Sequence, residues 1–317
     1  MPGPDALVVF LRPKVLLEFD VAMNTVAYMP LGALAWLVLR DGNPSWLARA
    51  KAVAACAAFS VTMEALQLFV THRVSSLYDV LANTTGAFAG TLFFAEPLRT
   101  LVAHPLTQAR ERLVAAGGWG DAGLVLVVLW LLAQLNPALP FFEAGNIGGE
   151  GEPVRGDFLV TAGSVALSVA GFGFFVSVVL KGPGGALRWT LLLLTAALWC
   201  KFAMASMMLK PHLSAGWVTE GRVLGLAAGL VAFAPLRGVR RTGRIYLAIV
   251  LTLAGALLAK IFGAYSALGD FLRLFSWPYG QLATFATLTR WIHEAWPVLA
   301  LAWLVALFVW RRDEPIE

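Results

Sequence analysis

Residues 60–90, SVTMEALQLFVTHRVSSLYDVLANTTGAFAG, place two apolar runs on either side of a short polar segment. The pattern is typical of two helices joined by a loop, with polar side chains gathered near the junction. Glu64 and Gln67 are three residues apart, and Asp79 and Asn83 are four apart, so each pair shares one face of its helix. Arg73 lies in the loop, within reach of either carboxylate. The stretch therefore predicts a helix–loop–helix with a polar cluster at its junction.

The junction has two compatible interpretations. In the first, Arg73 pairs with Glu64 or Asp79 and fixes the hairpin, because charges inside a membrane usually pair. In the second, the polar side chains form a pocket at the membrane surface that receives a charged or hydroxyl-rich headgroup. An arginine that binds such a headgroup also needs a carboxylate to hold it in place. The sequence leaves both interpretations open.

The composition of the whole chain indicates a membrane protein. Of its 317 residues, 59% are hydrophobic and 14% are charged, and the mean hydropathy is +0.74, whereas soluble domains contain about 25% charged residues. Apolar runs of about 20 residues recur, and each is long enough to cross a bilayer as a helix. We therefore expect an all-α, polytopic transmembrane helix bundle. The expected spans, about nine in number, are 21–39, 50–70, 80–98, 121–136, 159–180, 188–209, 222–236, 245–267 and 296–310.

The spans suggest a division of the chain into three parts. Residues 1–20 form an N-terminal interfacial segment, residues 21–120 a core of three spans, and residues 121–317 a C-terminal helical bundle. A basic loop with Arg99, Arg110 and Arg112 follows the third span. The bundle includes a Gly- and Pro-rich loop at 136–157, and an extra interfacial amphipathic helix is expected within 268–295.

The basic residues outside the spans predict an orientation. Fourteen of them flank one side of the predicted bundle and eight flank the other. The positive-inside rule puts the richer side in the cytoplasm. We therefore expect the N-terminus outside and the C-terminus in the cytoplasm, with the polar junction and the loop at 136–157 on the outer face.

Two motifs carry a resemblance to a known family. The pattern Glu64-x-x-Gln67, Arg73, Asp79-x-x-x-Asn83-x-x-Gly86-x-x-x-Gly90 is similar to the core signature of the VanZ-like membrane proteins. Asn24 followed by Tyr28-Met29-Pro30-Leu31-Gly32 resembles the family's N-x-x-x-F-x-P-x-G segment, with Tyr28 where Phe is expected. A later stretch, Gln134 to Phe141, resembles longer members.

The resemblance implies a multi-pass protein of the bacterial cytoplasmic (inner) membrane. VanZ-like proteins are associated with low-level resistance to teicoplanin-type glycopeptide antibiotics, and their biochemical activity is not settled. The resemblance thus points to the cell envelope without fixing a reaction.

The residues themselves lead to one set of candidates for binding and one for helix packing. Lys201 is added to the junction because an ammonium deep in an apolar run needs a partner, and a phosphate would suit it together with Arg73. Pro30 should kink the first span, and glycines let helices approach closely. The ligand-binding candidates are Asn24, Glu64, Gln67, Arg73, Asp79, Asn83 and Lys201. The helix-packing candidates are Pro30, Gly32, Gly86 and Gly90.

Three functions remain open from the sequence. The first is a non-enzymatic protein that binds a lipid-linked or anionic headgroup. The second is an intramembrane hydrolase or transferase acting on a phosphate-containing lipid, with Glu64 and Asp79 as acid and base. The third is a lipid or solute transporter. We expect membrane lipids as partners, with a polyprenyl-linked envelope precursor among the candidates, and we expect no nucleic acid, metal site or cofactor. The oligomeric state stays open.

Overall fold

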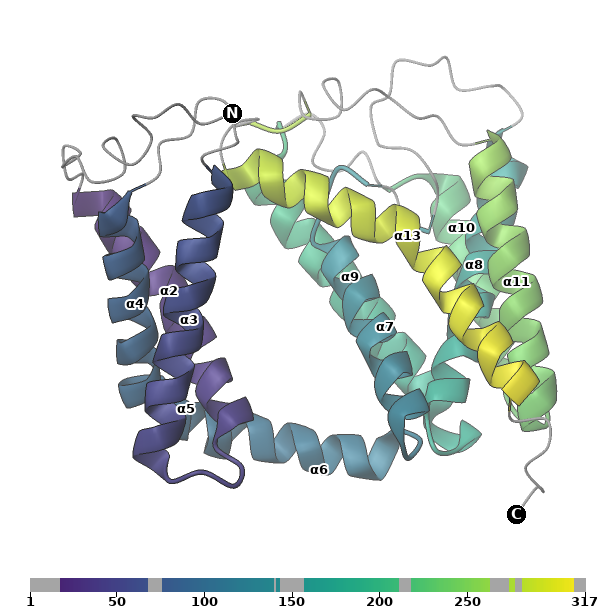
Figure 1. Ribbon diagram of the computed structural model, residues 1–317. Coiled ribbons are helices and arrows are strands. Elements are labelled where there is room, and N and C mark those ends of the chain that lie inside the picture. Colours follow the sequence, from purple (N-terminus) through teal and green to yellow (C-terminus); the bar gives the residue numbers. More distant parts are fainter. Residues whose placement is uncertain are drawn as a thin grey trace. The chain divides into compact units, whose positions relative to one another are not determined.

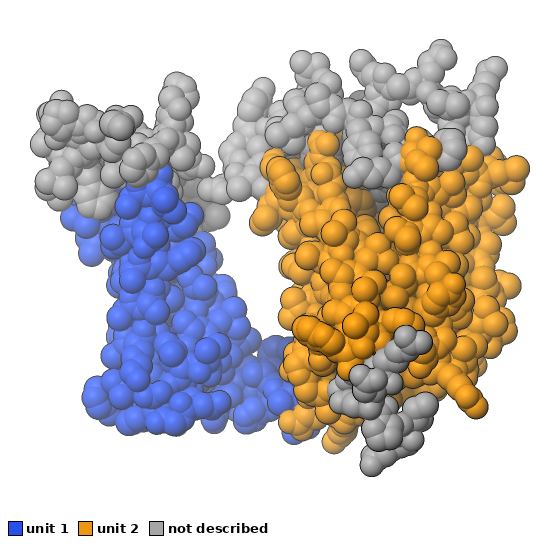
Figure 2. Space-filling view, turned by 45° about the vertical axis from the view of Figure 1, so that its right-hand side comes forward, with its two compact units in different colours: residues 1–109 blue, residues 110–317 orange. Residues whose placement is uncertain are grey.

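The computed structural model describes residues 18–67, 76–139, 141–142, 157–210, 218–262, 274–276 and 281–310. The chain divides into two compact units, residues 1–109 and residues 110–317 (Figure 2). All regular elements in the described ranges are helices, which confirms the predicted all-α class. The boundary between the two units falls at 109/110.

Unit 1 is a helical hairpin packed on a third helix (Figure 1). Its main helices are α2 (Glu18–Leu39), α3 (Ser45–Gln67) and α4 (Leu77–Ala89), and each contacts the other two. The turn between α2 and α3 uses Gly42 at a φ of 72°, a left-handed conformation that glycine adopts without strain. The Asn43 side chain donates a hydrogen bond of 2.9 Å to the Leu39 carbonyl, which satisfies one of the carbonyls left open at the end of α2.

The chain after α4 differs from the prediction. It continues through a π-helical segment η1 (Gly90–Phe94), α5 (Ala95–Leu98), a second π-helical segment η2 (Arg99–Ala103) and α6 (His104–Leu113). The prediction of a basic loop after residue 98 is therefore wrong, because residues 99–113 are helical. The segment QARER within α6 consists of good helix formers, and these outweigh its high charge.

Unit 2 is built around the buried helix α8 (Asp157–Val179) (Figure 1). The helices around it are α7 (Gly118–Gln134), α9 (Ala186–Met208), α10 (Glu220–Leu236) and α11 (Arg241–Phe262), and α13 (Gln281–Trp310) packs against α7 and α11. A short 3-10 turn, η3 (Pro183–Gly185), precedes α9. Aromatic side chains fill the core, where Phe172 stacks on Trp130 with ring centroids 4.1 Å apart.

Four helices in the described ranges are long and apolar enough to cross a membrane. They are Phe158–Val179, Pro183–Met208, Arg241–Ala259 and Phe285–Trp310, and the apolar helices Asn24–Leu39 and Gly118–Gln134 are shorter. These helices support the prediction of an integral membrane protein. The predicted number of nine spans is not confirmed.

The last helix also differs from the sequence prediction. Residues 281–295, expected in a separate interfacial helix, are continuous with the final span as one 30-residue helix that contains Pro297. An ion pair of 2.9 Å between Arg290 and Glu294, one turn apart, is formed on this helix, so the polar residues do not interrupt it.

Candidate functional site: a polar cluster between α2, α3 and α4

Each of the three main helices of unit 1 contributes a pair of polar residues spaced four apart. The pairs are Asn24 and Tyr28 on α2, Ser60 and Glu64 on α3, and Asp79 and Asn83 on α4. Residues four apart share one face of a helix. Because the three helices pack against one another, the three pairs can meet between them.

Hydrogen bonds connect these pairs across the helices. The Asn24 amide donates to a carboxylate oxygen of Asp79 over 3.0 Å. The Asn83 amide donates to the Ser60 hydroxyl over 2.9 Å, and Ser60 and Tyr28 also share a side-chain hydrogen bond. Each of the three helices is therefore linked to another by at least one polar contact. We call these six residues the polar cluster.

Glu64 holds the start of α4. Its carboxylate accepts a hydrogen bond of 2.9 Å from the backbone N–H of Ser76, the residue before the first turn of α4. Glu64 is only 5% exposed. A carboxylate near a helix N-terminus is stabilised by the helix dipole, so this contact ties α3 to α4 at the junction.

In the part of the chain that the structure describes, one polar atom of the cluster has no hydrogen-bond partner. Asn83 is 6% exposed, and its side-chain oxygen makes no hydrogen bond although its amide nitrogen does. Leaving a buried acceptor unsatisfied costs about 1–3 kcal/mol. The position is therefore suited to a hydrogen-bond donor from outside the protein, such as a water or a ligand hydroxyl.

Small residues bring α2 and α4 together beneath the cluster. A Cβ on Gly86 would lie 2.0 Å from the carbonyl oxygen of Thr25, and a Cβ on Gly90 would lie 2.0 Å from that of Met29. Gly32, on α2, faces the Ala87 carbonyl in the same way, at 2.2 Å. The predicted packing glycines thus lie where the two backbones meet, and this approach lets Asn24 reach Asp79.

Pro30 lies on a different side of α2. It lines an apolar groove of about 440 Å³ together with Met29, Phe94, Pro97 and Leu98, among others. The chain forming the far side of this groove includes the end of η1, α5 and η2. An apolar groove of this size suits a hydrocarbon chain better than a polar ligand.

The structure brings four of the seven predicted ligand-binding residues together: Asn24, Glu64, Asp79 and Asn83. Arg73 and the side chain of Gln67 lie outside the described residues. Sequence reasoning missed Tyr28 and Ser60. Their spacing of four from Asn24 and from Glu64 was the available signal.

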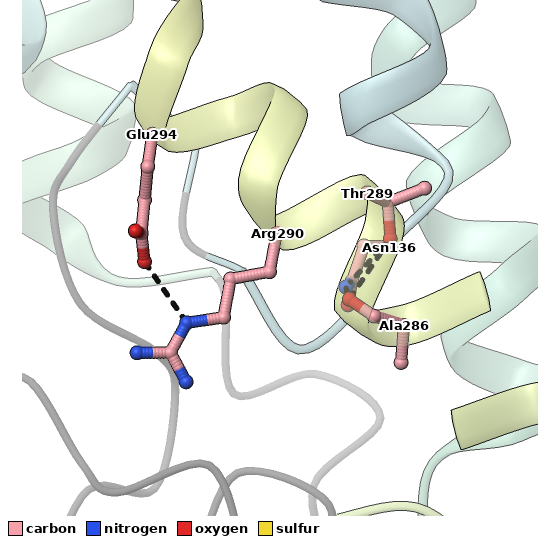
Figure 3. A network of polar contacts seen from close by, with 5 residues as sticks. All are labelled: Asn136, Ala286, Thr289, Arg290 and Glu294. Carbon is pink, nitrogen blue, oxygen red and sulfur yellow. Dashed lines mark hydrogen bonds and ion pairs between the residues drawn. The ribbon is translucent and has the colours of Figure 1, made fainter. Parts of the chain in front are cut away.

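Lys201 lies in unit 2, in a polar network of its own. Its ammonium group is fully buried and donates to the carbonyl oxygens of Asn136 and Leu139, at 3.0 and 2.9 Å. The Asn136 side chain donates in turn to the Ala286 carbonyl and the Thr289 hydroxyl, both over 2.9 Å (Figure 3). Lys201 therefore fixes the turn after α7, and that turn holds α13.

The fold and this cluster together define a helical membrane protein with a buried polar site in its N-terminal unit. Residues 5–102 match the VanZ/LLP1 family model. The first third of the chain is therefore a VanZ-like domain, which confirms the resemblance that rests on Asn24 to Gly90. The match ends before Gln134 to Phe141, so the resemblance of that stretch stays a prediction. No curated protein and no solved structure matches the chain.

Proposed function

We propose that the VanZ-like domain binds the headgroup of a lipid-linked or anionic envelope molecule at the polar cluster. The observation that carries the proposal is the meeting of three polar pairs, one from each helix, and a buried Asn83 oxygen that has no hydrogen-bond partner among the described residues. Polar side chains are costly inside a membrane and are commonly retained for function. A headgroup hydroxyl would supply the missing donor.

The charge of the site favours a role for Arg73. The described part of the cluster holds two carboxylates, Glu64 and Asp79. An anionic headgroup therefore needs a cation beside them, and Arg73, ten residues before Asn83, is the arginine of the same junction. A guanidinium can contact a phosphate through two parallel hydrogen bonds. In this proposal, the carboxylates orient Arg73 and the headgroup binds against it.

The apolar groove supports a lipid as the ligand. Its lining, which includes Met29, Pro30 and Phe94, offers hydrocarbon contacts on the same helix that carries Asn24. The proposal includes an outer-face position for the cluster, with the N-terminus outside and the C-terminus in the cytoplasm. An envelope role of this kind is in line with the association of VanZ-like proteins with glycopeptide resistance.

Native mass spectrometry of the purified chain tests the proposal. We expect a discrete polyprenyl-linked or anionic lipid to co-purify with the wild type and to be lost from Arg73→Ala and Asp79→Asn. Asp41→Asn is the matched control, because it removes one carboxylate charge from an exposed turn of the same unit. Retention of the lipid in folded Arg73→Ala and Asp79→Asn, or its absence from the wild type, would refute the proposal.

An intramembrane hydrolase or transferase is the second candidate, because the cluster holds two carboxylates that could act as acid and base. Glu64→Gln and Asp79→Asn keep the side-chain shape and remove the charge. An enzyme should lose all turnover of the co-purified lipid with either change. A binding protein should show no turnover even as wild type.

A further inference from the structure

One end of unit 2 collects the ends of several helices. The end of α8 lies beside the segment that joins α6 to α7, because Ala115 donates its N–H to the Val179 carbonyl and Lys181 donates its N–H to the Leu113 carbonyl, both over 2.9 Å. The start of α11 lies there as well, because the Arg244 guanidinium donates to the Ser177 carbonyl.

The helix α10 also ends at this end of the unit. Gly221 lies near Thr161, Gly229 lies near Val169, and Gly173 lies near Phe233, so α10 runs parallel to α8. The residues that follow α8 and α10 are therefore neighbours at one level of the unit. Six basic residues of these connections and of the adjoining helix starts form what we call the basic rim: Lys181, Arg188, Arg237, Arg240, Arg241 and Arg244.

The rim has an anchored part and an exposed part. Arg244 is 7% exposed and is held by its bond to α8. Arg237 donates to the Ala234 carbonyl over 2.6 Å at the end of α10. Arg188 and Arg240 are exposed, and neither takes part in an ion pair within the described ranges. Their charge is therefore available to a ligand from outside the unit.

Within the described residues, few carboxylates accompany this charge. In the described part of this end, the carboxylates are those of Glu111 and Asp121, and Asp121 is already paired with Arg110 over 2.6 Å. Cations gathered at one end of a helix bundle repel one another, and bound anions relieve that repulsion. The rim is thus complementary to a negatively charged surface.

Tryptophans mark the same level. Trp119 at the start of α7 meets Trp310 at the end of α13 with ring centroids 5.7 Å apart, and the Arg188 guanidinium lies 5.8 Å from the Trp189 ring. Tryptophan is enriched where the hydrocarbon of a bilayer gives way to headgroups. Because α8, α9, α11 and α13, which begin or end here, are long and apolar enough to span a bilayer, a rim at their ends would lie near the depth of the lipid phosphates.

We propose that the basic rim binds the phosphate groups of anionic lipids in the surrounding leaflet. The site lies in unit 2 and shares no residue with the polar cluster, so it goes beyond the function proposed above. Each arginine near an anionic headgroup strengthens binding about fivefold. Two exposed arginines together therefore account for roughly a 30-fold effect.

Titration of the purified full chain with phosphatidylglycerol, followed by native mass spectrometry, tests the rim. We expect Arg240→Gln to weaken phosphatidylglycerol binding about fivefold and Arg188→Gln/Arg240→Gln to weaken it roughly 30-fold. Phosphatidylcholine binding should not change. Lys210→Gln is the matched control, because Lys210 is an exposed cation at the opposite end of α9 and should have no effect.

Two outcomes would overturn the proposal that the basic rim binds anionic lipids. The first is an unchanged affinity for phosphatidylglycerol in the folded double variant, or an equal loss in Lys210→Gln. The second is a loss in Asp79→Asn with none in the double variant, which would assign the lipid to the polar cluster. Retention of the rim effect with no headgroup bound at the cluster would leave the rim intact and refute only the function proposed for unit 1.

Discussion

Gly86→Ala tests whether the close approach of α2 and α4 builds the polar cluster. The added Cβ would lie 2.0 Å from the Thr25 carbonyl oxygen, whereas ordinary contacts begin at 3.4 Å. The obstructing atom belongs to the backbone, so no side-chain rotation can relieve the contact. The two helices must separate at this point by about 1.4 Å, the difference between these two distances.

That separation has an energetic cost with two parts. Overpacking of a close interface typically costs about 1–3 kcal/mol. A shift of the same size would lengthen the 3.0 Å contact between Asn24 and Asp79 beyond hydrogen-bonding distance. Loss of a hydrogen bond to a charged group costs a further 1.5–3 kcal/mol, approximately. We therefore expect Gly86→Ala to lower the free energy of unfolding by about 2.5–6 kcal/mol and to reduce retention of the co-purified lipid.

Thermal unfolding in detergent, read beside native mass spectrometry, measures both effects. Gly163→Ala is the control, because its Cβ would find its nearest neighbour, Leu258, at 3.8 Å. Alanine is the better helix former, so the control should unfold at the wild-type temperature or above. If Gly86→Ala unfolds like the control and keeps the lipid, the close approach does not build the cluster.

Two further predictions concern unit 2. Lys201→Met should lower the unfolding temperature in detergent, because the buried carbonyls of Asn136 and Leu139 lose their donor. Each unsatisfied carbonyl costs about 1–3 kcal/mol of stability. An unchanged temperature would show that another donor replaces the lysine. Trp296→Phe should lower the free energy of unfolding by about 1 kcal/mol in the same assay. It removes the 2.7 Å hydrogen bond from the indole N–H to the Leu126 carbonyl and keeps an aromatic ring. A loss of several kcal/mol would mean that ring packing, and not this hydrogen bond, dominates at the site.

The sequence could predict the polar cluster because its determinants are local. The spacing of Asp79 and Asn83 by one helical turn sets their common face, and Gly86 continues that face one turn further. Glycine has no side chain, so its place in an apolar helix already indicates close packing. The partners of these residues could not be predicted in the same way. That Asn83 meets Ser60 depends on how α3 and α4 pack.

Helix boundaries were harder to predict for a physical reason. Hydropathy ends a predicted span where charge begins, but helix propensity does not follow hydropathy. The segment after Leu98 is polar and still helical, and the two π-helical segments on either side of α5 have no marker in composition. For the same reason, residues 281–295 are helical and continue into the final span although they contain charged residues. A charged turn on one face of a helix can be accommodated by an ion pair such as Arg290 with Glu294.

The polar cluster and the Lys201 network differ in a way that separates structure from function. Lys201 donates to two carbonyl oxygens in the turn after α7, and Asn136 of that turn donates to α13. A structural role, holding this turn against α13, therefore accounts for all of these contacts. In the polar cluster, the Asn83 side-chain nitrogen donates to Ser60, whereas its buried oxygen accepts no hydrogen bond from any described residue. A purely structural residue at that position would favour an apolar side chain, since the unsatisfied oxygen costs more than the one bond returns. Asn83→Leu should therefore leave stability unchanged or raise it, while abolishing retention of the headgroup. A clear loss of stability in that variant would place the cluster beside Lys201 as a structural network.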